Sequence, residues 1–119
     1  MALREAADSV LDSFAVKDGV AGIALVARDG LPVAHRFSGP CNADAVCAMA
    51  AAMMGAADAA LLDMGGKEAL RLHADSDGLR LSAGSIDEDL MLLLVCDGGG
   101  PDELLGEAIA AMRVAIQEA

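Results

Sequence analysis

The chain has 119 residues, of which 55% are hydrophobic, and a formal net charge of −11 at pH 7. This length suits one domain, residues 1–119, because two separate cores would each be too small to stand alone. The acidic balance and the absence of Trp and Tyr exclude nucleic acid as a partner, since binding it depends on basic side chains and aromatic stacking surfaces.

The cysteines and the apolar segments indicate the cellular compartment of the protein. Three cysteines, an odd number, do not make a disulfide framework. Residues 1–5 carry an acid where a secretion signal needs a basic start, and the uncharged run at residues 45–57 is too short for a membrane span of about 20 residues. We therefore expect a soluble cytoplasmic protein with no direct membrane insertion.

The chain begins with the pattern of a helix followed by a hairpin. Apolar residues recur at helical spacing over residues 3–16, which predicts the first helix. Two apolar segments follow, Val20–Arg28 and Leu31–Phe37, and Asp29-Gly30 between them favours a two-residue turn with positive φ. Pro32 has no N–H to donate, so the second strand is expected at an edge of the sheet.

A long helix is expected next, from a cap at Asn42 or Asp44 to about residue 64, where two glycines stop it. Residues 45–57 contain no charged side chain, whereas a helix lying on a sheet needs only one apolar stripe. In a chain this acidic, the second apolar side predicts a surface that needs a partner. Met49 and Met53 share one face, and the helix is expected to divide its methionines between the core and a partner.

Three strands and a helix complete the pattern. Residues 69–74 and 79–83 alternate between apolar and polar side chains, with a turn predicted at Asp75–Gly78. The continuous apolar run Leu90–Cys96 is typical of a strand covered on both faces, and therefore of a central strand. Gly98–Pro101 then leads into the closing helix, with Pro101 suited to its first position. The apolar stripe of that helix is Leu105, Ile109, Met112 and Ile116.

The element order is therefore helix, two strands, helix, three strands, helix. A central strand that is covered on both faces requires helices on both sides of the sheet. The sequence predicts an α+β domain with three layers, a sheet between two layers of helices.

This order, combined with the hairpin Val20–Ala34 and its Arg28–Pro32 turn, resembles the roadblock family (roadblock/dynein light chain domains) over essentially the whole chain. Gly22, the Ala/Met-rich helix and the closing apolar strand belong to the same resemblance. The resemblance implies a five-stranded antiparallel sheet in the spatial order 2-1-5-4-3. It also implies that the long helix covers one face and the two terminal helices cover the other.

The resemblance further implies a homodimer, in which third strands pair edge to edge and long helices lie antiparallel. The edge expected to pair is residues 67–74, and small side chains, Ala51 among them, would let two long helices approach closely. The residues expected at the dimer or partner interface are Ala48, Met49, Ala52, Met53, Gly55, Ala56, Ala59, Lys67, Ala69, Arg71 and His73.

The function that the resemblance implies is regulation or scaffolding of a small Ras-like GTPase, through the paired helices at residues 43–64. The chain is expected to be no enzyme itself and to carry no cofactor, and the short single-domain form is typical of prokaryotic members. One alternative is an adaptor in a motor or signalling assembly that does not contact a GTPase. Another is a small-molecule sensor, although no aromatic side chains are available to line a pocket.

Other motifs fit ordinary structural roles better than chemical ones. Cys41, Cys47 and His35 lack the short paired spacing and the fourth ligand of a zinc site. Asp75–Gly78 begins like a calcium loop, but its later ligand positions are apolar. Gly98–Gly100 precedes a helix but has acids rather than a lysine beside it, which disfavours phosphate. Neither histidine has a nucleophile beside it in an activating pattern.

Overall fold

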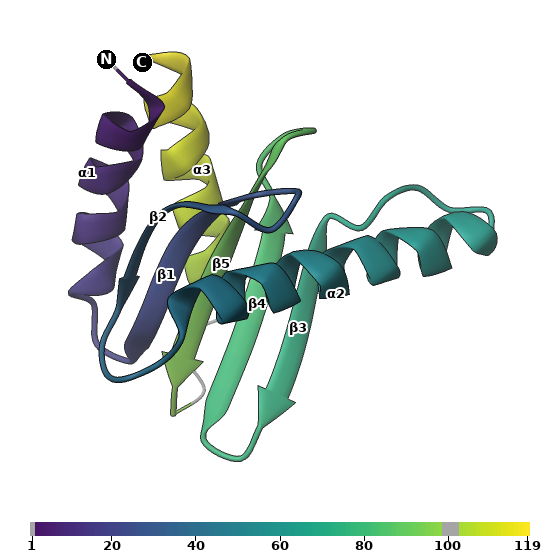
Figure 1. Ribbon diagram of the computed structural model, residues 1–119, viewed down its shortest axis with the longest axis horizontal. Helices are drawn as coiled ribbons and strands as arrows, with labels where there is room; N and C mark the ends of the chain where they lie inside the picture. The colour runs from purple at the N-terminus through teal and green to yellow at the C-terminus, as the bar shows by residue number, and fades with distance from the viewer. Residues whose placement is uncertain (1, 99–102) are drawn as a thin grey trace.

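A computed structural model describes residues 2–98 and 103–119 and shows one sheet between two helical layers (Figure 1). The five strands are antiparallel and lie in the order β2-β1-β5-β4-β3, which confirms the predicted order. The elements are α1 (Leu3–Ala15), β1 (Val20–Ala27), β2 (Pro32–Phe37), α2 (Ala43–Asp63), β3 (Arg71–Ser76), β4 (Leu79–Ser85), β5 (Leu90–Asp97) and α3 (Glu103–Gln117). Pro101, predicted to start the last helix, lies outside the described residues.

The central strand β5 separates two apolar cores. Leu92 and Leu94 pack with α1 and α3 on one face, while Met91 and Leu93 pack beneath α2 on the other. All four side chains are buried, as the continuous apolar run predicts. The α2 layer therefore rests on its own core, and the opposite surface of α2 is left free for other contacts.

The turn of the first hairpin is longer than the sequence predicts. The Ala27 N–H donates to the Leu31 carbonyl at 2.9 Å and the Gly30 N–H donates to the Ala27 carbonyl at 2.8 Å, so the loop has the three residues Arg28–Gly30. Gly30 has φ +99°, and within the described residues no other residue type has positive φ. A two-residue turn with positive φ at both positions would force Asp29 there, and the glycine-ended three-residue loop avoids that strain.

The second half of the sheet also differs in detail from the prediction. β3 begins at Arg71 rather than at residue 69, and it continues through Asp75 and Ser76. Ser76 pairs with Leu79, so the turn is Asp77-Gly78 alone. β3 thus forms the outer edge of the sheet opposite β2, whose edge position was correctly predicted from Pro32.

Gly22 leaves room for the ring of Phe37 on the neighbouring strand β2. A Cβ atom at Gly22 would overlap the ring of Phe37 at Cδ1, whereas a Cβ atom at Gly55 of α2 would have nothing within 4 Å. We expect Gly22→Ala to lower the free energy of unfolding by about 1–3 kcal/mol through overpacking. Gly55→Ala is the matched control and should raise it by about 1 kcal/mol, because alanine favours a helix over glycine. Urea unfolding of both variants at one protein concentration checks the pair, and equal shifts would contradict the placement of Phe37.

Candidate functional site

The helix α2 presents one side to the sheet and leaves the rest open. Its buried residues Cys47, Ala50, Ala51 and Met54 follow helical spacing and face β1 and β5. Ala51 therefore packs in the core and is not free for a second helix. Asn42 caps the helix, because its Oδ1 accepts the Ala45 N–H at 3.1 Å, which selects Asn42 over Asp44.

The outer face of α2 is apolar and exposed. Met49 is 57% exposed, and its exposed neighbours carry side chains no larger than a methyl group. The outer face consists of Ala48, Met49, Ala52, Gly55, Ala56 and Ala59. Met53 differs from these residues, since it is partly buried against the core beneath the helix. The predicted second apolar side is therefore present. Met49 and Met53 do not share one face as predicted, because Met49 lies on the surface and Met53 lies at the margin of the core.

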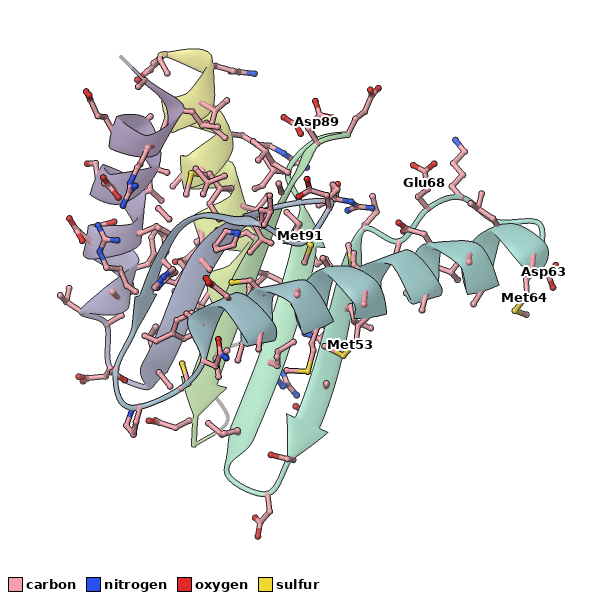
Figure 2. All side chains as sticks on the ribbon, viewed as in Figure 1. Met53, Asp63, Met64, Glu68, Asp89 and Met91 are labelled. Carbon is pink, nitrogen blue, oxygen red and sulfur yellow. The ribbon has the colours of Figure 1, made fainter. Side chains whose placement is uncertain are left out.

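The last turns of α2 extend past the edge strand β3 (Figure 1). We call residues 59–64 the overhang; Met64 lies at its tip (Figure 2) and is 84% exposed. Leu61 and Leu62 on the overhang are 43% and 51% exposed. Met64 thus projects beyond the sheet of its own chain, whereas Leu62 lines a pocket with Arg28, Asp58 and Ala69 of that chain.

Arg28 and Asp58 fix the chain where it leaves α2 and returns to the sheet. Arg28 Nη2 donates to Asp58 Oδ2 at 2.6 Å, and the Ala69 N–H donates to Asp58 Oδ1 at 2.6 Å. Ala69 is 4% exposed, so it is buried within its own chain and does not lie at the free edge. Lys67 is exposed but precedes β3, which corrects its predicted place on the pairing strand.

The anchoring role of Asp58 was not visible in the sequence. In the sequence, Asp58 is simply the first charged residue after the uncharged run of residues 45–57. Arg28 lies thirty residues earlier in the chain, and the Ala69 amide lies eleven residues later. No local spacing connects such positions, and only the tertiary structure brings them together.

β3 offers unpaired backbone groups at the free edge of the sheet. The Ser85 N–H donates to the Leu70 carbonyl at 3.0 Å, and this bond sets the alternation along the strand. Even-numbered residues of β3 therefore direct their N–H and C=O groups to β4. Arg71, His73 and Asp75 direct theirs outward, so two of the predicted edge residues, Arg71 and His73, do lie at the edge.

The side chains of these three residues share the face of the sheet that carries α3. His73 Nδ1 lies 2.8 Å from Ser82 Oγ, and Asp75 accepts hydrogen bonds from Arg80 Nε and Nη2 at 2.6 and 3.2 Å. The hydrogen bonds from Arg80 lower the pKa of the Asp75 carboxyl, so Asp75 is negatively charged at neutral pH. Arg71 lies against Gly106 of α3 and has no acidic partner among the described residues.

A pocket of about 580 Å³ lies on the opposite face, beside the first turns of α2. Its β3 wall is Ala74 and Ser76, and its floor includes Leu81 and Val95 of the neighbouring strands. Other lining residues are Ala21, Phe37, Ser38, Gly39, Pro40, Cys41, Val46, Asp75 and Leu79. Most of these side chains are apolar, so the pocket is suited to apolar side chains rather than to a charged ligand.

The cysteines occupy three different environments. Cys41 is exposed, while Cys47 and Cys96 are buried in the two cores. Burial, helped by the charge of Asp44, raises the pKa of the Cys47 thiol to about 11. A metal ligand must be a thiolate, which this environment disfavours. In the described part of the chain, no group of three or more His, Cys, Asp or Glu side chains could hold a metal ion.

By length and composition α2 could also cross a membrane, unlike its uncharged run considered alone. A helix that packs on a sheet meets the same criteria, and α2 contributes buried residues to the core. Its charged residue Asp58 is also tied to Arg28 of the first hairpin. These contacts place α2 on the sheet of its own domain, with its apolar outer face exposed.

Comparison with known proteins agrees with this architecture. The Roadblock/LC7 domain model matches residues 6–95. The structure of the gliding protein MglB from Thermus thermophilus superimposes with a TM-score of 0.86 at 24% identity, covering 100% of this chain and 94% of that one. A Roadblock/LC7 domain from Streptomyces avermitilis gives a TM-score of 0.82 at 17% identity, covering 93% and 94%.

A third similar structure is described as MglB with a tetrameric arrangement, with a TM-score of 0.85 at 21% identity, covering 99% of this chain and 93% of that chain. No curated protein matches the chain by sequence. The structural likenesses show the fold, and the family model covers most of the sequence. The chain therefore belongs to the Roadblock/LC7 domain family.

Proposed function

We propose that this protein is a non-enzymatic, homodimeric regulator or scaffold of a small Ras-like GTPase in the cytoplasm. The observation that carries the proposal is the exposed apolar outer face of α2 in a strongly acidic chain. An apolar surface of this kind marks an interaction site. The family resemblance implies that this face binds a small Ras-like GTPase.

The dimer is supported by the free edge of β3. An exposed edge strand invites pairing with another chain, and a second copy of the same strand closes it symmetrically. The overhang of α2 points in the same direction as this edge (Figure 1), so both unpartnered features face one neighbour. Pairing two chains there would place their α2 helices side by side, with residues 43–64 of each contributing to one platform.

The GTPase is proposed to dock on the outer faces of the two helices. Alanine and glycine residues allow the close approach of another backbone, and the flexible side chain of Met49 adapts to the shape of the surface that it contacts. The protein would act by holding or repositioning the residues of its partner. The many acidic side chains would favour a partner with a basic rim through electrostatic steering.

Ala52→Arg tests this docking face, because it places a long charged side chain in the middle of the outer face. We expect it to weaken binding to a Ras-like GTPase at least about tenfold, the size expected when an apolar contact is replaced by a desolvated charge. Val114→Arg is the matched control, since Val114 is 53% exposed on α3 in the other helical layer. Biolayer interferometry measures both variants, with sedimentation confirming an unchanged mass. Wild-type affinity of Ala52→Arg would contradict docking on this face.

A further inference from the structure

We propose that two chains pair about a two-fold axis at His73, so that Arg71 of each copy faces Asp75 of the other. The same axis places the overhang of each α2 over the apolar pocket of the second copy. This inference rests on the proposed dimer. It adds the register in which the two β3 strands pair, and it identifies the overhang of the second copy as the segment that covers the pocket.

The backbone supplies the first argument. Only Arg71, His73 and Asp75 direct N–H and C=O groups to the free edge. In an antiparallel pair of two such strands, outward-directed residues must face each other as hydrogen-bonded pairs. A shift by one residue is excluded because it would turn every side chain to the wrong face of the sheet. The axis must therefore lie at a residue, and His73 is the middle of the three.

Charge complementarity supplies the second argument. Arg71 and Asp75 have opposite charges and are equally distant from His73 along the strand. An axis at His73 therefore brings two Arg71–Asp75 pairs together across the interface. Arg71 has no acidic partner among the described residues of its own chain, so the second copy would provide one.

Neighbouring registers lose this complementarity. An axis at Ala74 would place Arg71 opposite Asp77, but Asp77 lies in the turn between β3 and β4 and is not extended. An axis at Leu72 would place Arg71 opposite His73, so neither Arg71 nor Asp75 would face an opposite charge in the second copy, and Asp75 would keep only Arg80 of its own chain. It would also direct each α2 onto the other, because Leu72 is where α2 packs on β3.

The pocket supplies the third argument. Along β3, the core beneath α2 includes Leu72, whereas the pocket is lined by Ala74 and Ser76. Leu72 and Ala74 lie on opposite sides of His73 along the strand. A two-fold rotation about His73 therefore brings Leu72 of one chain, beneath its α2, opposite Ala74 of the other chain, at the pocket. The overhang would then place Leu61 and Met64 over a pocket lined mainly by apolar side chains.

Cysteine cross-linking identifies the residue at the axis. Single variants Leu72→Cys, His73→Cys and Ala74→Cys are made with Cys41→Ser, since Cys41 is the exposed thiol and the other two are buried. Hydrogen-bonded partners have Cα atoms about 5.5 Å apart, within the range of a disulfide. We expect rapid self-cross-linking of His73→Cys alone, and a mixed disulfide between Leu72→Cys and Ala74→Cys chains.

The possible outcomes distinguish a wrong register from the absence of a dimer. Self-cross-linking at position 72 or 74 instead would overturn the register and leave the dimer standing. A dimer by sedimentation with no cross-link at any of these positions would overturn pairing through β3. A monomeric wild-type chain at micromolar concentration would overturn the proposed dimer itself.

The charge pairs have an independent test in mixed dimers. Arg71→Glu and Asp75→Lys should each weaken self-association by about tenfold or more, because like charges then face each other twice. A mixture of the two variants should recover association, since both facing pairs become opposite in charge. The Arg80 contact of Asp75 is lost in both chains of the Asp75→Lys homodimer and in one chain of the mixed dimer, whereas the Arg71→Glu homodimer keeps it and is the control. No recovery on mixing would overturn the charge pairing.

Discussion

A His73→Pro variant is expected to be a folded monomer. The His73 N–H points to the free edge, so proline at this position removes no hydrogen bond of the β3–β4 ladder. In the dimer it removes both N–H donors of the central pair and puts two proline rings at the axis. The dissociation constant should rise at least about 100-fold, or about 3 kcal/mol, from the lost hydrogen bonds and the packing they bring.

Ala74→Pro is the informative comparison for this variant. Ala74 is adjacent in sequence, but its N–H points inward to β4, opposite Leu81. Proline there should lower the free energy of unfolding by about 1–3 kcal/mol, because the facing carbonyl loses its partner inside the sheet. Sedimentation equilibrium and urea unfolding, applied to both variants, distinguish the two effects. A His73→Pro protein that remains dimeric would show that the edge of β3 is not the pairing surface.

An Asp58→Ala variant is expected to lose about 2–4 kcal/mol of folding free energy, somewhat less than a fully enclosed ion pair would cost. The side chains of Arg28 and Asp58 are 25% and 14% exposed. Arg28 Nη1 is already buried without a hydrogen-bond partner among the described residues. Removing Asp58 would leave the guanidinium unpaired and would also remove the acceptor of the Ala69 N–H.

Two further variants separate charge from hydrogen bonding at this anchor. Asp58→Asn keeps an oxygen that can accept the Ala69 N–H, so it should lose less stability than Asp58→Ala. Asp63→Ala, an exposed site on the same helix, should change stability little. Urea unfolding gives the stabilities, and hydrogen exchange at the Ala69 amide reports whether the segment before β3 has opened. Slow exchange in Asp58→Ala would contradict the anchoring role.

Hydrophobic patterning was sufficient to predict most of the fold. The apolar run of β5 indicated a strand covered on both faces, and the missing charge on α2 indicated a helix with a spare apolar side. Both signals come from side chains that must be buried or partnered wherever the backbone goes. The sheet order came from the family resemblance, and the position of Pro32 agreed with it.

The failures have a different physical origin. Residues 69 and 70 alternate as in a strand, but the Ala69 N–H is taken by Asp58 from a distant part of the chain. The length of the first turn depends on which backbone groups pair, and the Asp29-Gly30 dipeptide does not determine that. The pocket and the overhang depend on where α2 crosses the sheet, and helical periodicity contains no information about that crossing.

The most direct test of the proposed function is binding to a Ras-like GTPase from the same genome, loaded with GDP or with a non-hydrolysable GTP analogue. We expect binding to one nucleotide state at least about tenfold tighter than to the other, which corresponds to about 1.4 kcal/mol of selectivity. Absence of binding in both states, for every such GTPase in the genome, would contradict a GTPase regulator and favour an adaptor that uses the same fold.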